Sequence, residues 1–317
     1  MGQTQLKTAK LGDTGMEITR VGFGAWAIGG GGWPFGWGPQ QDDESIAAIG
    51  RALELGVNWI DTAAAYGFGR SEEIVGRALA GVGAKPYVFT KCSLVDDGTR
   101  HVKHVLKRDS VLREAEASAR RLGVDAIDLY QIHWPNPEAD IEEGWAALAE
   151  LKEQGLVRHI GVSNFSVGQL RRISGIAPVE TIQPQYSLIS RDVEAELLPH
   201  AERAGTGVIV YSPMGSGLLT GAITRERIAA MPDDDWRRSA PDFTEPRLSD
   251  NLALADRLRV VAGRHDTTAG AVAVAWTLRN PAVDGAITGF RRPSQVDPIL
   301  AAANLELTGQ DIAEIEA

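Results

Sequence analysis

Four side chains capable of acid-base chemistry stand near the ends of three predicted strands. Asp61 and Tyr66 lie in the stretch NWIDTAAAYG, Lys91 lies in YVFTKC, and His133 lies in LYQIHWP. Since the carboxyl ends of parallel strands meet at one rim, we expect these four side chains to lie close together. A cluster of titratable groups on one rim is typical of an active site, whereas any one of them alone would fit a structural role.

These residue types suit the polarisation and protonation of a carbonyl group. A phenol has a pKa of about 10, and a nearby ammonium group favours phenolate, so we expect Lys91 to lower the pKa of Tyr66 and make it a general acid. Asp61 would hold the Lys91 ammonium in place and keep it charged. A neutral His133 could donate a hydrogen bond to a carbonyl oxygen as negative charge develops there.

A second reaction class stays open at the same lysine. A barrel lysine can form a Schiff base with a carbonyl substrate, which would make the chain an aldolase or lyase through Lys91. A carboxylate that keeps the amine charged argues against that use. No serine or cysteine nucleophile is expected, because the single cysteine, Cys92, follows Lys91 directly and strand alternation turns it to the opposite face.

Metal and phosphate-loop motifs are not predicted. His101 and His104 offer two metal ligands, but no cysteine or third histidine stands near them in the sequence. The stretch GFGAWA from residue 22 lacks the third glycine of a dinucleotide fingerprint, and GVGAK from residue 81 lacks the Lys-Ser/Thr ending of a phosphate loop.

The elements that must position these residues alternate between short β-rich runs and amphipathic helices. The predicted strands are Val21–Ala27, Asn58–Ala63, Tyr87–Cys92, Ala126–His133, Val157–Asn164, Thr181–Ser187, Gly207–Pro213 and Gly285–Phe290. The predicted helices include Asp43–Leu55, Ser71–Ala80, Asp109–Leu122, Ile141–Gln154 and Val193–Ala204. Eight such units without a break in composition predict an α/β fold, a (β/α)8 TIM barrel that forms one domain over residues 1–317.

Three segments fall outside this alternation. Leu6–Lys10 and Glu17–Arg20 flank a Gly-Asp-Thr-Gly turn, which predicts a β-hairpin that closes the N-terminal end of the barrel. Long loops are predicted at 29–38 and 220–250, and both follow strands, so we expect them at the C-terminal face where barrel active sites lie. Their aromatic residues, with the residue after His133, are predicted to wall an apolar substrate pocket: Trp33, Phe35, Trp37, Trp134 and Trp236.

Composition limits the class of protein. The chain has 317 residues, of which 44% are hydrophobic and 23% charged, as expected for a folded soluble protein with a sizeable core. A net charge of −10 and the lack of a basic run argue against nucleic acid or an anionic membrane as a partner. One cysteine, an N-terminus without an apolar leader and no long apolar run predict a cytoplasmic protein without a membrane span.

The ordered motifs resemble those of the aldo-keto reductases, which are NAD(P)H-dependent barrel enzymes. The motifs that carry the resemblance are IDTAAAYG, TK, QIHWP, GVSNF and YSPMGSGLLTG, and it extends over nearly the whole chain. It implies reversible reduction of an aldehyde or ketone to an alcohol, with NADPH expected as the cofactor and NADH as the alternative. Tyr66 would supply the proton, assisted by Lys91 and Asp61. His133 would orient the carbonyl, and hydride would come from C4 of the nicotinamide.

The resemblance also implies a set of cofactor contacts. The nicotinamide carboxamide would be bound by Ser163, Asn164 and Gln183, with Tyr211 stacked on the ring. The diphosphate would lie against 212–218, whose backbone N–H groups suit an anion. In the stretch from Gly289 to Gln295, Arg291 or Arg292 could pair with a 2′-phosphate. The complete implied set is Gly24, Trp26, Asp61, Ser163, Asn164, Gln183, Tyr211, Ser212, Pro213, Met214, Ser216, Gly217, Leu218, Gly289, Arg291 and Gln295.

The sequence departs from the family in one place. Pro298 and Ile299 replace an acidic residue and an asparagine that commonly face the adenine, so the preference for NADPH is expected from the two arginines alone. A non-catalytic role also stays open, because some relatives of the family act as cofactor-sensing subunits on partner proteins; the complete set of four favours catalysis. The substrate is expected to be a small carbonyl compound, and the sequence leaves its identity and the oligomeric state open.

Overall fold

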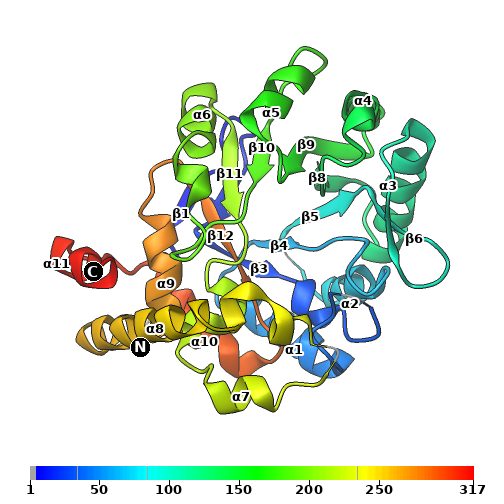
Figure 1. Ribbon diagram of the computed structural model, residues 1–317. Helices are drawn as coiled ribbons and strands as arrows, with labels where there is room; N and C mark the ends of the chain where they lie inside the picture. Colours follow the sequence, from blue (N-terminus) through cyan, green and yellow to red (C-terminus); the bar gives the residue numbers. More distant parts are fainter. Residues whose placement is uncertain (1–4, 34, 84, 234) are drawn as a thin grey trace.

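The computed structural model describes residues 5–33, 35–83, 85–233 and 235–317. The predicted loops 29–38 and 220–250 and the predicted domain 1–317 therefore include positions outside the described residues, among them 34, 84 and 234. Figure 1 shows a ring of strands enclosed by helices.

Eight parallel strands close into a barrel, which confirms the predicted (β/α)8 TIM fold. In order around the ring they are β3 (Val21–Gly24), β4 (Trp59–Asp61), β5 (Tyr87–Cys92), β8 (Ile127–Ile132), β9 (Val157–Ser163), β10 (Thr181–Gln183), β11 (Gly207–Val210) and β12 (Gly285–Gly289). Pairing of β12 with β3 closes the ring.

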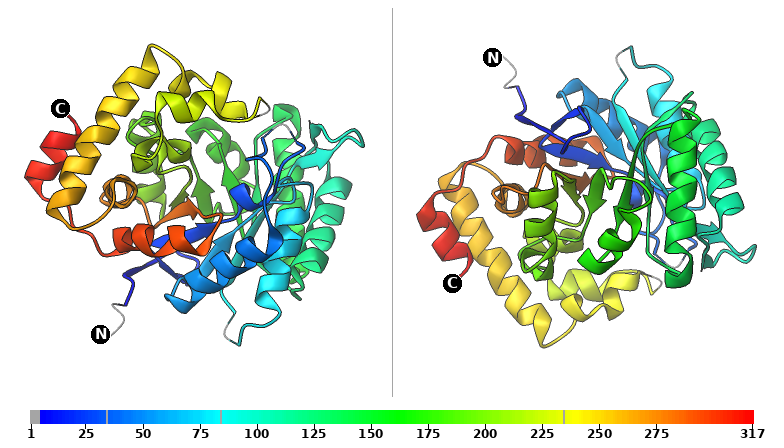
Figure 2. Two further views of the ribbon diagram at one scale, coloured as in Figure 1. Left: turned by 90° about the horizontal axis from the view of Figure 1, so that it is seen from below. Right: turned by 90° about the horizontal axis from the view of Figure 1, so that it is seen from above.

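Helices surround the barrel in all three views of Figures 1 and 2. They are α1 (Asp42–Glu54), α2 (Arg70–Leu79), α3 (Arg108–Leu122), α4 (Ile141–Glu153), α5 (Val167–Ile173), α6 (Leu197–Ala204), α7 (Arg225–Ala229), α8 (Arg247–Arg264), α9 (Ala269–Leu278), α10 (Val296–Leu300) and α11 (Gly309–Ile315). In α4, for example, Ile141, Trp145 and Leu148 recur at helical spacing and are buried in the main core between helices and sheet.

Strand alternation divides the barrel interior into an apolar layer and a polar layer. Trp59, Phe89 and Leu129 form the apolar layer with Ile209 and Ile287. Two residues further along the same strands, the inward positions are polar: Asp61, Lys91 and Gln131, all buried. The alternation therefore places the acid-base groups at the C-terminal end of the barrel.

The N-terminal end is covered by the predicted hairpin, here β1 (Thr8–Lys10) paired with β2 (Glu17–Thr19). Leu11, Met16 and Ile18 pack against the apolar layer, and the Trp59 indole N–H donates to the Thr19 carbonyl at 2.8 Å. A Cβ at Gly22 would lie 2.1 Å from the Trp59 ring, so only glycine leaves room for this indole.

Several predicted strands extend too far. The strand predicted over Thr181–Ser187 ends at Gln183, because Pro184 has no N–H to continue the ladder. The strand predicted over Val21–Ala27 ends at Gly24 and is followed by the 3-10 helix η1 (Trp26–Ile28). The predicted helix Val193–Ala204 begins as the 3-10 turn η3 (Asp192–Glu194) and becomes α-helical only at Leu197.

Two further segments differ from the expected loops. A second hairpin of β6 (Leu94–Asp96) and β7 (Val102–His104) follows β5 and was not predicted. The stretch 220–250 is not an irregular loop but a series of short helices, some of them capped by side chains such as Thr224 and Asp235. It contains the end of η4 (Gly215–Thr220), then α7, η5 (Trp236–Ser239), η6 (Pro241–Phe243) and the first turn of α8; elsewhere lie η2 (Glu138–Asp140), η7 (Pro293–Gln295) and η8 (Ala301–Ala303).

Within the described residues, no helix has the length and apolar character needed to cross a membrane.

Candidate active site

A buried ion pair forms the centre of the polar layer. The Lys91 ammonium donates to Asp61 Oδ1 at 2.6 Å and to the Thr62 carbonyl at 2.8 Å. Both side chains are shielded from solvent, with 1% of Lys91 and 2% of Asp61 exposed. The other carboxylate oxygen of Asp61 accepts a hydrogen bond from the Gln183 side chain at 2.8 Å. The pair is thus held in a single geometry from three strands.

Tyr66 and His133 complete the group of four. The Tyr66 ring lies in the turn after β4, and its centroid is 5.3 Å from the Lys91 ammonium. The His133 ring meets it edge-on, with the centroids 5.6 Å apart. The structure therefore brings together all four residues that the sequence singled out, in the turns and strands at one end of the barrel.

The pKa values in this group follow burial more than charge. Burial raises the pKa of Tyr66 well above its usual value, and the negative charge of Asp61 adds to the rise. The expectation that the pKa of Tyr66 is lowered beside Lys91 is therefore wrong, because burial dominates and the Asp61 charge acts in the same direction. Burial lowers the pKa of Lys91 against the opposing charge of Asp61. The pKa of His133 lies well below its usual range through burial and then through the Lys91 charge, so the imidazole is neutral at pH 7.

Three of the residues implied to bind a nicotinamide carboxamide hydrogen-bond to one another beside this group. The Ser163 hydroxyl donates to the Gln183 carbonyl at 2.7 Å, and the Asn164 amide donates to the His133 carbonyl at 2.9 Å. The Tyr211 hydroxyl donates to Asn164 Oδ1 at 2.8 Å. Nearby, the buried Gln131 Nε2 has no partner within the described residues. An unsatisfied donor beside an amide-rich wall fits a ligand that carries a carboxamide.

The segment 212–218, which the resemblance places against a diphosphate, is a tight and kinked turn. Ser212, Gly215, Ser216 and Gly217 all have positive φ, and η4 is kinked between Ser216 and Gly217. Within this turn the backbone N–H groups of Gly215 and Gly217 donate to the carbonyls of Ser212 and Met214, at 2.9 and 3.1 Å. Gly24 lies two strands further around the ring from β11, at the end of β3, and is paired with Asp61 of β4.

The two arginines after β12 have different surroundings. The Arg291 guanidinium donates from Nε to Gln40 Oε1 at 2.8 Å and from Nη2 to the Pro39 carbonyl, and Gln40 Nε2 donates back to the Arg291 carbonyl at 2.7 Å. The Gln295 side chain accepts from the backbone N–H groups of both arginines. Arg292 is exposed. Arg291 therefore links Pro39 and Gln40, at the end of the first long loop, to the turn that follows β12. Arg292 faces outward.

Comparison with known proteins identifies the chain. The model of the Aldo/keto reductase family matches residues 20–317. The chain belongs to the aldo-keto reductase family. It is 38% identical to the aldo-keto reductase YhdN of Bacillus subtilis, covering 98% of this chain and 92% of that protein. It is 35% identical to the NADH-specific methylglyoxal reductase of Escherichia coli, covering 96% of each.

The solved structures give the same family. A glycerol dehydrogenase from Gluconobacter oxydans superposes with a TM-score of 0.86 at 37% identity, covering 100% of this chain and 95% of that one. The protein is therefore an oxidoreductase of carbonyl and alcohol groups that uses a nicotinamide cofactor, as its family does.

In this aldo-keto reductase, four of the five predicted pocket aromatics join one cluster above Tyr66. Trp33 contacts Phe35, Phe68 and Tyr66 with centroid separations of 6.0 to 6.3 Å. Trp26 contacts Tyr66, Trp37 and Trp236. Trp134 follows His133 and is 41% exposed, and Phe35 is 50% exposed, so these two lie toward the rim of the site. Phe243, a further aromatic of the late segment, is instead buried in a small cluster with Leu218 and Leu248.

Two residues near the site were not predicted from the sequence to belong to it. Arg237 was not considered, and His104 was considered only as a metal ligand. Arg237 lies over the Trp37 ring at 4.3 Å and pairs with Asp235 at 2.6 Å. His104 lies close enough to His133 for its charge to lower the pKa of that residue. No group of three metal-ligating side chains occurs in the described part of the chain.

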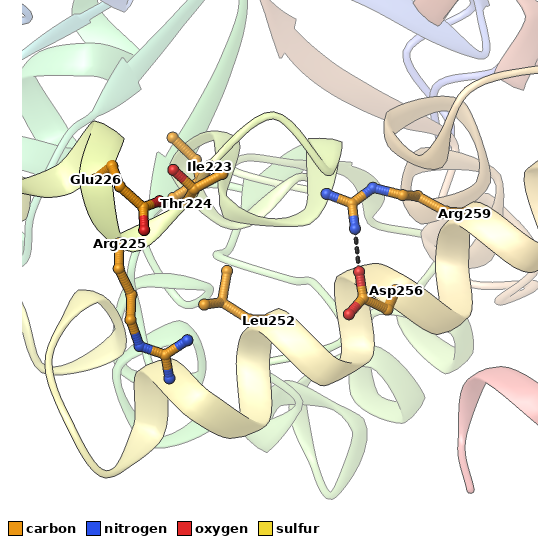
Figure 3. Close-up of a pocket in the computed structure, with 7 residues that line it drawn as sticks. All are labelled: Ile223, Thr224, Arg225, Glu226, Leu252, Asp256 and Arg259. Atoms are coloured by element: carbon orange, nitrogen blue, oxygen red, sulfur yellow. Dashed lines mark hydrogen bonds and ion pairs between the residues drawn. The ribbon is translucent and has the colours of Figure 1, made fainter.

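A separate pocket lies between α7 and α8 (Figure 3). It is lined by Ile223, Thr224, Arg225, Glu226, Leu252, Asp256 and Arg259. Arg259 bonds to Asp256 within it, and Arg225 pairs with Glu245 beside it. None of the four acid-base residues lines this pocket, so it lies outside the candidate active site.

Behind Lys91, on the helix side of β5, lies the half-buried carboxyl group of Glu114. Glu114 accepts hydrogen bonds from the Ser93 backbone N–H and the Ser110 hydroxyl, both at 2.9 Å, and burial raises its pKa to about 7. Cys92 faces the same side, as strand alternation predicted, and burial raises the pKa of its thiol.

The Glu114 carboxyl predicts a pH dependence of stability. Its folded-state pKa is raised above the unfolded value of 4.5, so its contribution is fully present below pH 4.5 and is lost as the pH rises through about 7. Relative to Glu114→Gln, the wild-type free energy of unfolding should fall by roughly 3 kcal/mol across this window, to judge by the size of the shift. Urea denaturation of both proteins at pH 5 and pH 8 tests this; parallel pH dependences would contradict it.

Proposed function

We propose that this aldo-keto reductase reduces an aldehyde or ketone with NADPH, accepting NADH less well, and that Tyr66 supplies the proton. The observation that carries the proposal is the buried Lys91–Asp61 pair with the Tyr66 and His133 rings against it. We further propose that the chain acts as one domain over 1–317, in the cytoplasm, on a small-molecule substrate and without a metal ion.

The proposed roles follow from the charge state of each group. Tyr66 keeps its proton at neutral pH because its pKa is raised. A developing alkoxide is a much stronger base than a phenolate, so the proton is transferred only as the carbonyl is reduced. Neutral His133 donates to the same oxygen, and the Lys91 ammonium stabilises the phenolate that Tyr66 leaves. Asp61 positions the ammonium.

The residues present fit a nicotinamide cofactor, which when bound supplies the hydride from C4. Ser163, Asn164 and Gln183 would hold the carboxamide and Tyr211 the ring face. The positive-φ segment 212–218 would hold the diphosphate through Ser212, Pro213, Met214, Ser216, Gly217 and Leu218, and the 289–295 turn would hold the adenosine end through Gly289, Arg291 and Gln295. Gly24 and Trp26 would border the nicotinamide.

The class of reaction is tested by a substrate panel. NADPH consumption, followed by absorbance, should be measured with propanal, glyceraldehyde, methylglyoxal, a simple ketone and a sugar. The panel includes oxygenated three-carbon compounds because relatives are named for methylglyoxal and glycerol. Tight NADPH binding without turnover of any compound would contradict the proposal and favour a cofactor-sensing role.

Cofactor preference should depend on Arg292 more than on Arg291. The exposed Arg292 guanidinium suits a 2′-phosphate, which NADH lacks, whereas Arg291 is held by Gln40 and Pro39. We expect Arg292→Glu to raise the Kd for NADPH by roughly 10- to 150-fold, as for the loss of a charge-assisted bond, and to leave the Kd for NADH almost unchanged. Titration of protein fluorescence with each cofactor measures both constants.

Arg291→Glu serves as the comparison. Because it breaks the link to the loop 29–40, it should weaken both cofactors and raise KM for the substrate as well. Equal affinity of the unmutated protein for NADPH and NADH would overturn the preference, while leaving the proposed reduction chemistry in place.

A further inference from the structure

Above Tyr66, aromatic rings from two distant loops form a closed stack. Trp26 lies against the Tyr66 ring at a centroid distance of 6.3 Å and an angle of 28°. The Trp236 ring stacks with the Trp26 ring at a centroid distance of 5.8 Å and an angle of 17°. Trp37 meets both indoles edge-on, at 5.5 Å from Trp26 and 6.3 Å from Trp236. A substrate that reaches Tyr66 must therefore share this space with three indole rings.

The indole N–H groups in this cluster fall into two kinds. The Trp26 N–H donates to the Phe35 carbonyl at 3.0 Å, and the Trp33 N–H donates to the Gly30 carbonyl at 3.1 Å. The N–H groups of Trp37 and Trp236 are buried, and among the described residues neither has a hydrogen-bond partner. A buried donor without an acceptor destabilises a protein, and two such donors in one cluster indicate that something else accepts from them.

The two unsatisfied indoles are held in place from outside the cluster. The Arg237 guanidinium lies over the Trp37 ring at 4.3 Å and is itself fixed by Asp235, which is 6% exposed. Trp236 belongs to the stretch 220–250. Residues of this stretch pack with Leu218 in a separate apolar cluster that also contains Ile223, Ile228, Phe243 and Leu248.

We infer that Trp37 and Trp236 are specificity residues whose indole N–H groups bind a second oxygen of the substrate. The chain would then select small carbonyl compounds that carry a further hydroxyl or carbonyl group, over plain aldehydes of the same length. This inference rests on the proposed function. The reacting carbonyl lies at Tyr66 and His133, and the second oxygen accepts from the indoles, which must part to admit it.

The kinetic test removes one N–H at a time and keeps an aromatic ring. Trp37→Phe and Trp236→Phe should be assayed with glyceraldehyde and with propanal, which has the same number of carbons and no second oxygen. For each variant, kcat/KM for glyceraldehyde should fall by roughly 2- to 12-fold, the value of one hydrogen bond, while kcat/KM for propanal changes less than twofold. Trp33→Phe is the matched control, since its N–H is already bonded within the loop; it should affect both substrates by the same factor.

A second measurement does not depend on turnover. With indole nitrogens labelled by ¹⁵N, the protein with NADPH is titrated with glycerol or with 1-propanol, alcohols that NADPH does not convert. Glycerol should move the Trp37 and Trp236 N–H signals downfield, identified by their loss in the two Phe variants, and 1-propanol should not. Equal losses for both aldehydes, or no selective shift with glycerol, would overturn the inference. If the unmutated protein reduces neither aldehyde, the proposed function fails, and the glycerol shifts still decide whether the indoles bind oxygen.

Discussion

Tyr66→Phe should lower kcat by about 10² to 10⁴, the range for loss of a general acid, which corresponds to roughly 3 to 5 kcal/mol in the activation barrier. The substitution removes one oxygen and keeps the ring that packs against Trp26 and His133. Since the hydroxyl acts on the carbonyl oxygen as charge develops, its loss should appear in kcat. The Kd for NADPH should change less than twofold.

Tyr87→Phe provides a matched control for this substitution. Tyr87 begins β5 at the opposite end of the strand from Lys91 and packs beside the apolar layer. Its variant should keep kcat within about twofold, because a surface or boundary hydroxyl away from the site has little effect. Turnover close to wild type in Tyr66→Phe would remove this residue from the proposed mechanism.

Lys91→Met should damage both stability and activity. It leaves the Asp61 carboxylate buried, with Gln183 as a remaining partner but no opposing charge. Loss of one member of a buried pair costs about 3 to 5 kcal/mol of unfolding free energy, and loss of one charge-stabilising group costs about 10² to 10³ in kcat. Urea denaturation and steady-state kinetics measure the two effects separately.

The double variant Lys91→Met, Asp61→Asn separates these effects further. Because it removes both charges, it should recover most of the lost stability but none of the lost kcat. Recovery of activity together with stability would show that Lys91 serves only to hold the fold, contrary to the proposal.

The sequence predicted the barrel well because each strand carries its own signal. Short β-rich runs stand between amphipathic stretches, and the acid-base residues follow them at fixed positions. The ends of strands were less predictable, since Pro184 interrupts β10 and only an isolated bridge between Gln185 and Tyr211 continues the pairing. The hairpin β6–β7 has strands of only three residues, too short to give a periodic pattern.

The parts of the site that the sequence could not give depend on distant partners. Gln40 and Arg291 are separated by 251 positions, and no local pattern marks either residue. Arg237 follows a tryptophan in a polar stretch, and nothing in the sequence around it predicts that its guanidinium lies over the Trp37 ring. The direction of the Tyr66 pKa could not be read from its neighbours either, because it depends on how far burial outweighs charge.

The reciprocal bonds between Gln40 and Arg291 bear on how this enzyme could change during evolution. They join the loop that carries Trp33 and Trp37 to the turn that would bind the adenosine end of the cofactor. A mutation at Arg291 would therefore weaken cofactor binding and alter substrate fit together, and selection on either trait would oppose it. In the described contacts the Arg292 side chain makes no bond to the loop that carries Trp33 and Trp37. A mutation at Arg292 could therefore change the preference from NADPH to NADH and leave the substrate pocket nearly unchanged. Engineering toward NADH should begin at Arg292 and leave Gln40 and Arg291 intact.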